Sequence, residues 1–132
     1  MDDLQTITDL LYCPGEPMAG SGMTDEQALA YARERFSYFE FCLVRHWLWI
    51  DLDVTDAQRV ELEKTRRQPV ILYAHQVIYD SARRWDVGDV VRTSPLVSFE
   101  DDFLFRTLNS VYLLLGDGQR KRSTLETVGR IF

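Results

Sequence analysis

The side chains best suited to chemistry are carboxylates that follow an apolar segment. Asp51, Asp53 and Asp56 come directly after the apolar run 39–50, so they are expected at the end of a strand. Read as an EF-hand loop, this segment has Asp56 where glycine is needed and Leu62 where the closing glutamate is needed. An alternative is that two of these carboxylates bind Mg²⁺. The preferred interpretation is a solvated strand end, with Asp56 in the first turn of a helix.

The histidines and cysteines form no recognisable metal motif. Cys42 and His46 have the i, i+4 spacing of a metal-binding pair only on a helix. In the strand expected here, four residues separate them by about 13 Å, too far to share one ion. His75 is interpreted as a structural or surface residue in the middle of another strand. We therefore predict that the chain folds without a metal, a cofactor or a disulfide, with reduced thiols as in the cytoplasm.

Motifs for nucleophilic and phosphate chemistry are absent from the sequence. Gly20-Ser21-Gly22 lacks the preceding strand and the immediate helix of a nucleophile elbow, and no glycine-rich phosphate loop occurs. Arg92-Thr93-Ser94 resembles the Arg and Ser strand motifs of ADP-ribosyltransferases, but the later Glu100 and Glu126 do not form the glutamate pair those enzymes use. We expect no catalytic residue. The alternative is a small enzyme with a sheet-end site drawn from Asp51, Asp53, His46 and His75.

The charge distribution favours a protein partner over nucleic acid. The net charge is −6, and residues 1–60 carry 11 acidic against 4 basic side chains. An acidic surface repels phosphate backbones and attracts basic protein surfaces. No apolar run reaches the length of a membrane span, and the acidic N-terminal residues are unlike a secretory signal. The predicted contact residues for a basic partner form two acidic runs: Asp51, Asp53 and Asp56, and Glu100, Asp101 and Asp102.

Apolar periodicity predicts one α+β domain over residues 1–132, with N-terminal helices packed on a mainly antiparallel, twisted sheet of about five strands. Residues 13–23 are expected to form a loop, 116–118 a turn, and 123–132 either a strand or a helix. The expected helices are 2–11, 24–36 and 55–67, the last two starting at capping boxes. The expected strands are 39–53, 70–79, 88–99, 103–107 and 111–115.

The segment 39–53 carries the strongest strand signal, and both of its faces are apolar. Strict alternation places Cys42, Val44 and His46 on one face, and Leu43, Arg45 and Trp47 on the other. Such a pattern is typical of a central strand covered on both sides. Its length also favours a bend or a tight hairpin near Arg45 and His46, and the sequence leaves both open.

The C-terminal half carries the pattern V-R-T-S-x-L-V-x-F, followed by N-x-V-Y-x-L-L-G-x-G, within residues 85–122. This pattern resembles a family of small uncharacterised proteins of bacterial genomes and prophages that has no assigned activity. The resemblance implies that the chain is an accessory protein of a mobile element, a class that often binds and blocks a host or defence protein. Together with the charge, it predicts a small, acidic, cytoplasmic, non-enzymatic protein-binding module. A housekeeping protein without such a partner stays an alternative.

Overall fold

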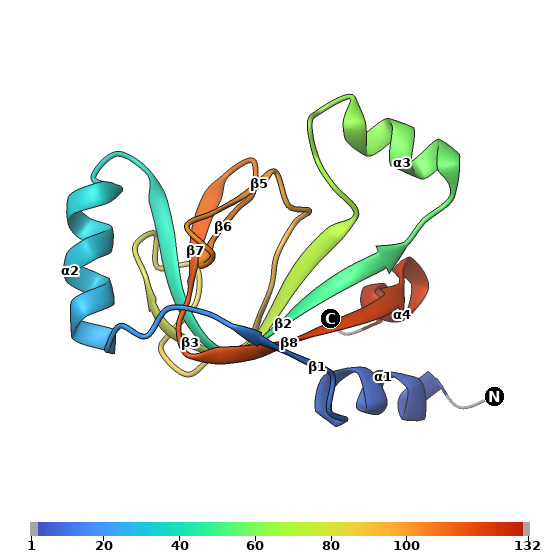
Figure 1. Cartoon of the computed structure of the whole chain (residues 1–132), viewed down its shortest axis with the longest axis horizontal. Helices are drawn as coiled ribbons and strands as arrows, with labels where there is room; N and C mark the ends of the chain where they lie inside the picture. Colours follow the sequence, from blue (N-terminus) through green and yellow to red (C-terminus); the bar gives the residue numbers. More distant parts are fainter. Residues whose placement is uncertain (1–2, 131–132) are drawn as a thin grey trace.

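A curled sheet and the helices around it make up the computed structural model, which describes residues 3–130 (Figure 1). In those residues the elements are α1 (Asp3–Tyr12), β1 (Glu16–Ala19), α2 (Asp25–Arg35), β2 (Glu40–Asp53), α3 (Asp56–Glu63), β3 (Val70–Asp80), β4 (Val91–Arg92), β5 (Ser98–Glu100), β6 (Leu104–Arg106), β7 (Ser110–Leu114), β8 (Asp117–Thr124) and α4 (Leu125–Gly129). The α+β class is therefore confirmed. The expected strand number is wrong, because these residues form eight strands, and the helices are not all N-terminal.

Strand β2 is the centre of the sheet. It pairs antiparallel with β3 on one side. On the other side it pairs in parallel with β7 over its first part and with β8 over its second part. The expected turn at 116–118 is wrong: the chain continues in the same direction past Gly116, whose φ of +69° lies in the left-handed region that glycine tolerates. The sheet order is β1-β8-β2-β7-β6-β5, with β3 and β4 beyond β2.

The sheet curls until the segment 91–100 bridges its two sides. Leu96 exchanges hydrogen bonds with the start of β3: its N–H donates to the Val70 carbonyl and its carbonyl accepts from the Gln68 N–H, both at 2.8 Å. The next residue, Val97, donates to the Arg106 carbonyl of β6 at 2.7 Å. The segment thus changes partner between Leu96 and Val97. The curled sheet encloses an inner core of side chains that includes Trp47, Trp49, Leu72, Phe105 and Leu114.

A bend at His46 gives β2 its shape. His46 has φ +55°, and Arg45 beside it donates from Nε to Asp25 Oδ1 at 2.7 Å, which ties the bend to α2. The bend shifts the side-chain alternation by one residue, so Val44 and Trp47 both point into the inner core. Strict alternation along 39–53 is therefore wrong across this point, and the bend is the correct alternative to a hairpin.

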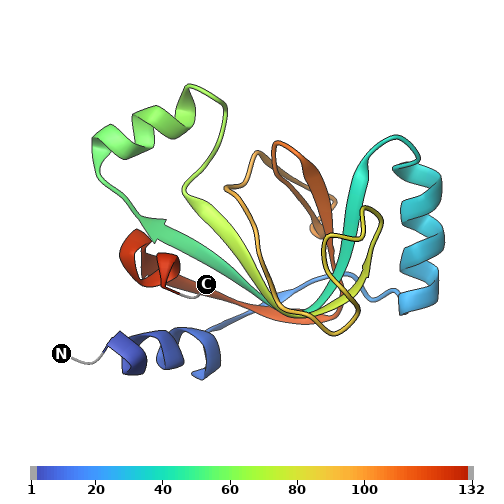
Figure 2. The ribbon, with the colours of Figure 1, turned by 180° about the vertical axis from the view of Figure 1, so that it is seen from behind.

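Helices cover the outer face of the sheet in two places (Figure 2). Helix α2 packs its fully buried Ala28 and Ala32 near the first part of β2, where small side chains permit close approach. Helices α1 and α4 cover the second part of β2, through Leu10 and Val128. Of the C-terminal segment 123–132, residues 123–124 end β8 and Leu125–Gly129 form α4, while residues 131–132 lie outside the described residues. Strand β1 lies inside the expected loop 13–23. Helix α3 projects away from the sheet and buries none of its residues (Figure 1).

Candidate functional site

Two carboxylates of the first acidic run are ion-paired within the chain. Asp51 accepts two hydrogen bonds from Arg120, at 2.6 Å and 3.0 Å, and Asp53 accepts one from Arg122 at 2.6 Å. The pairs form because β2 and β8 run side by side, although 69 residues separate the partners in sequence. Asp56 lies exposed at the start of α3. Much of the negative charge of this run is therefore offset locally.

The second acidic run forms a tight turn between β5 and β6. Asp101 and Asp102 both have left-handed backbones, with φ of +55° and +64°, a conformation that aspartate tolerates better than most residues. Arg35 of α2 lies 3.9 Å from a Glu100 oxygen and 3.7 Å from an Asp101 oxygen. Arg106 of β6 approaches Glu100 at 2.7 Å. Half of the Asp101 side chain stays exposed, so the turn still presents negative charge to solvent.

An exposed aromatic pair lies next to this turn. Tyr38 and Phe39, in the link between α2 and β2, are 96% and 62% exposed. The Arg106 guanidinium lies 5.9 Å from the Phe39 ring centroid and pairs with Glu100, so one side chain joins Phe39 to the acidic turn. We call this surface the aromatic–acidic patch; it consists of Arg35, Tyr38, Phe39, Arg106 and residues 100–102.

Beside the aromatic–acidic patch the surface is hollowed. The hollow has a volume of about 530 Å³ and is lined by Arg33, the 36–41 segment and Ser81 with Ala82. Large exposed aromatic rings next to arginine are the composition of binding hot spots in protein interfaces. The patch therefore offers an apolar anchor, a receptive hollow and a charged rim on one surface.

A second hollow, of about 560 Å³, brings together both histidines of the chain. His46 lies at the bend of β2 and His75 lies on the neighbouring strand β3. The register Arg45–Gln76 and Trp47–Ala74 places the two histidines opposite one another. Asp117 at the start of β8 lines the same hollow. Asp51 and Asp53 do not line this hollow, so the structure does not assemble the two carboxylates and two histidines of the enzyme alternative into one site.

The ring of His75 is held from several sides. Its Nε2 lies 3.2 Å from the Leu11 carbonyl at the end of α1, Tyr12 stacks on it at 5.3 Å between centroids, and Tyr73 meets it edge-on at 4.9 Å. Burial lowers the pKa of His75; the Leu11 carbonyl opposes this effect, and His46 adds to it. His75 is therefore neutral at pH 7 and has a defined orientation.

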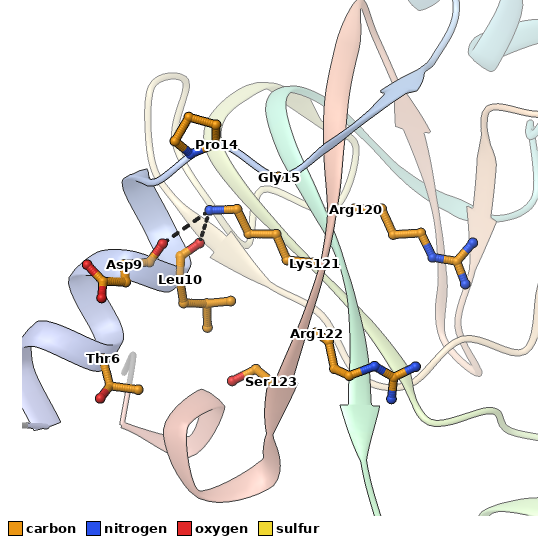
Figure 3. Close-up of a pocket in the computed structure, with 9 residues that line it drawn as sticks. All are labelled: Thr6, Asp9, Leu10, Pro14, Gly15, Arg120, Lys121, Arg122 and Ser123. Atoms are coloured by element: carbon orange, nitrogen blue, oxygen red, sulfur yellow. Dashed lines mark hydrogen bonds between the residues drawn. The ribbon is translucent and has the colours of Figure 1, made fainter.

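Lysine 121 occupies the region shown in Figure 3. Its Nζ donates to the Leu10 carbonyl at 2.6 Å, to the Asp9 carbonyl at 3.2 Å and to the Cys13 carbonyl. These are carbonyls of the last turn of α1 and of the residue after it, where a cation is favoured by the helix dipole. Arg120 and Arg122 point away from Lys121 in Figure 3, so the three basic residues do not form one anion site. Lys121 therefore serves to attach the C-terminal end of α1 to β8.

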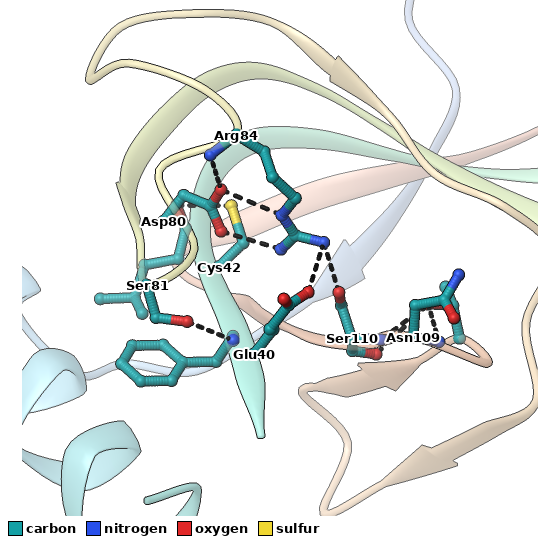
Figure 4. A network of polar contacts seen from close by, with 10 residues as sticks. Glu40, Cys42, Asp80, Ser81, Arg84, Asn109 and Ser110 are labelled. Atoms are coloured by element: carbon teal, nitrogen blue, oxygen red, sulfur yellow. Dashed lines mark hydrogen bonds and ion pairs between the residues drawn. The ribbon is translucent and has the colours of Figure 1, made fainter. Parts of the chain in front are cut away.

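An ion pair between buried Asp80 and partly exposed Arg84 organises the far end of β3 (Figure 4). Arg84 binds both oxygens of Asp80, at 2.8 Å and 3.1 Å, and donates to Ser110 Oγ at 2.5 Å. Burial acts to raise the pKa of Asp80, but the hydrogen bonds from Arg84 outweigh it and the pKa lies below the ordinary value. Burial raises the pKa of the nearby Cys42 thiol to about 12, so this thiol is not a nucleophile at neutral pH. The network joins β3 to β7 and serves the fold.

Sequence reasoning missed the aromatic residues of the patch and the pairing of the histidines. Tyr38 and Phe39 precede an apolar strand and so resemble core residues. The sequence holds no signal that separates Phe39 from the strand, because Phe39 continues the apolar alternation of Phe41 and Leu43. For His46 and His75 no local signal exists, because only the register of β2 on β3 places them together.

Comparison with known protein families adds membership and no activity. Residues 18–130 match the family described as Domain of unknown function (DUF6957), and the chain belongs to that family. Searches of curated proteins and of solved structures found no match. The membership agrees with the expected resemblance to an uncharacterised family. Within residues 3–130, no helix has the length and apolar character needed to cross a membrane.

Proposed function

We propose that this chain is a small protein-binding module that recognises a basic surface on a partner through the aromatic–acidic patch. The observation that carries the proposal is that Arg106 links exposed Phe39, which follows exposed Tyr38, to Glu100 of the acidic turn. Aromatic rings supply apolar contact area at a small entropic cost, while the surrounding carboxylates guide a basic partner into place. The net charge of −6 acts in the same direction.

In its sharpest form, the proposal is an accessory protein of a phage or prophage that acts in the cytoplasm on a host defence or nucleic-acid-processing complex. A carboxylate-rich surface can occupy a basic channel that otherwise holds nucleic acid, because both present negative charge. Tyr38 and Phe39 would then stand in for stacked bases. The first acidic run supports this less well, since Asp51 and Asp53 already have arginine partners.

The test compares two charge variants that remove equal charge. The first is Asp101→Asn with Asp102→Asn, which keeps a residue type that tolerates the left-handed backbone. The control is Asp53→Asn with Asp56→Asn. Each protein is immobilised and exposed to host lysate at low and at high salt, and retained proteins are quantified. We expect a specific partner to be lost from the first variant and retained by the control, with the difference largest at low salt.

A second variant, Tyr38→Ser with Phe39→Ser, tests the apolar anchor. Both side chains are exposed, so the melting temperature should not fall, while retention of the same partner should drop at least tenfold at either salt concentration. Equal loss in the Asp53/Asp56 control and the turn variant would show that binding follows net charge and not the acidic turn, and would overturn the proposal. Unchanged capture by every variant would overturn the proposal.

A further inference from the structure

The hollow that contains both histidines has the features of a small metal site, independent of the proposed partner surface. His46 and His75 lie opposite one another on antiparallel strands and line the same hollow. Directly opposite residues of an antiparallel pair have Cβ atoms about 4.5–5.5 Å apart. Two imidazoles at that spacing can reach one ion, since zinc–nitrogen bonds are about 2.0–2.1 Å long.

The hydrogen bonding of His75 sets which nitrogen is available. The Leu11 carbonyl can only accept, so Nε2 of His75 carries the proton and Nδ1 keeps its lone pair. A histidine whose second ring nitrogen donates to a backbone carbonyl is the usual arrangement of a metal ligand. Stacking by Tyr12 and the edge contact of Tyr73 hold this ring in place before any ion arrives.

The backbone conformation at His46 keeps its side chain at the surface of the hollow. Its φ of +55° is uncommon for a residue with a side chain, and the strand bend keeps the residue exposed at the surface of the hollow. Asp117 is the first residue of β8, the strand that pairs with β2 from Leu48 onward. Its carboxylate lines the hollow and adds negative charge that favours a cation.

We propose that His46 and His75 bind a divalent ion of the zinc, nickel or copper class, with water at the remaining positions and Asp117 as a nearby counter-charge. Among residues 3–130, no set of three His, Cys, Asp or Glu side chains converges as a complete metal cluster, so two protein ligands define the site. Imidazole nitrogen selects these ions over Mg²⁺ and Ca²⁺, which prefer oxygen. A site with open positions exchanges its ion readily and does not support the fold.

The experiment is calorimetric titration of the full chain with Zn²⁺ and, separately, Ni²⁺, with Mg²⁺ as the negative ion. The variants are His46→Asn and His75→Gln. Asparagine is chosen at position 46 because it tolerates the left-handed backbone conformation. Cys13→Ser is the control, because the exposed Cys13 thiol is a competing soft ligand close in sequence to Tyr12. Thermal melts establish that each variant is folded.

We expect one zinc ion per chain, at least tenfold weaker binding in each histidine variant, and unchanged binding in Cys13→Ser. Asp117→Asn should weaken binding less than either histidine change. Histidine ring NMR signals of the wild type should shift on addition of Zn²⁺, which reports on the ligands even if one variant folds poorly. The proposal is overturned if zinc leaves these signals unmoved, or if the double variant His46→Asn/His75→Gln binds zinc as the wild type does.

Discussion

At the residue scale, the inner core depends on one aromatic ring and one glycine. Trp47 is 1% exposed, and its indole N–H donates to the Leu115 carbonyl at 3.3 Å. Gly118 of β8 lies flat against this ring: a Cβ there would come within 2.3 Å of the indole. The absence of a side chain at Gly118 is what lets β8 pass over Trp47.

Gly118→Ala should therefore be strongly destabilising. The added methyl group meets a large ring that is buried on all sides, and overpacking of this kind costs about 1–3 kcal/mol or more. Gly22→Ala is the matched control, because nothing lies within 4 Å of a Cβ at Gly22. Urea denaturation of both variants measures the free energy of unfolding. Equal stability of the two would show that β8 does not approach Trp47 as described.

Trp47→Ala and Trp49→Ala should each lower the free energy of unfolding by about 3–5 kcal/mol, as for other buried aromatics. Trp49 is 7% exposed and packs edge-on against Phe99 and Phe105. Tyr38→Ala is the control, since that ring is 96% exposed and should change stability little. Wild-type stability in both tryptophan variants would contradict a structural role and favour docking or stacking instead.

Asp80 should make folding stability depend on pH. Its pKa in the folded protein lies below the ordinary value of 3.8, because the hydrogen bonds from Arg84 outweigh the effect of burial. The ion pair therefore contributes stability above that value, and the contribution is lost as pH falls through the folded-state pKa. Asp80→Asn should cost about 1.5–3 kcal/mol at pH 7, since it removes the charge-assisted hydrogen bonds from Arg84 and leaves that guanidinium only Glu40, at 3.5 Å, as a described ion-pair partner.

Chemical denaturation of wild type and Asp80→Asn at pH 7, 5 and 3 measures the gap between them. The difference in free energy of unfolding between wild type and variant should be constant from pH 7 to 5 and should become smaller only at pH 3. Asp86→Asn, on the exposed loop that follows Arg84, serves as control. A gap that instead widens towards low pH would contradict the lowered pKa.

At the scale of the elements, the helices differ in how they are held. Helix α2 is anchored by buried alanines and by the bond from Arg45 to Asp25. Helix α3 keeps its capping box but buries nothing, and a helix of 8 residues is marginal without packing. Helix α1 has few buried residues and is attached to the sheet through Leu10 and the carbonyls that Lys121 binds.

Lys121→Met should loosen α1 while the sheet stays folded. Methionine keeps most of the aliphatic contact but removes the cation at the helix C-terminus, an interaction worth up to about 2 kcal/mol when partly buried. Hydrogen exchange should quicken at the amides of α1 and stay unchanged in β2 and β3. Lys64→Met is the matched control, because Lys64 pairs with exposed Glu61 on the surface of α3. Equal exchange in α1 for both variants would show that Lys121 does not hold the helix.

At the scale of the whole molecule, three apolar clusters hold the sheet and its helices together. One lies inside the curled sheet, one lies beneath α2, and one lies beneath α1 and α4. Strand β2 contributes to all three, because the bend at His46 turns successive parts of it towards different layers. Neither cysteine forms a disulfide: Cys13 is exposed, and Cys42 lies buried in the inner core.

The thermal melt should be the same with chelator, with reductant and without either. The three clusters supply the burial, and the proposed ion site at His46 and His75 lies at the rim of a surface hollow, so its loss leaves the core intact. Scanning calorimetry under the three conditions measures this. A fall of several degrees with chelator would show a structural metal, and the same fall with reductant would show a disulfide.

Local hydrogen bonds could be predicted from the sequence. Thr24 with Gln27 and Thr55 with Gln58 form the expected capping boxes, because all the groups involved lie within four residues. The hairpin of β6 and β7 and the apolar character of 39–53 follow from similarly short-range patterns. The α+β class follows from the order of these local signals.

Only the tertiary structure decides which distant groups meet. Arg120 neutralises Asp51, and His46 lies opposite His75, because β2 pairs with β8 and with β3; neither pairing leaves a local trace. The bend at His46 shifts the side-chain alternation by one residue. The alternation seen in 39–53 therefore predicts the strand correctly but assigns the side chains beyond the bend to the wrong face of the sheet. The physical reason is that strand pairing depends on the free energy of the assembled sheet, to which many distant residues contribute together, whereas caps and turns form from neighbours alone.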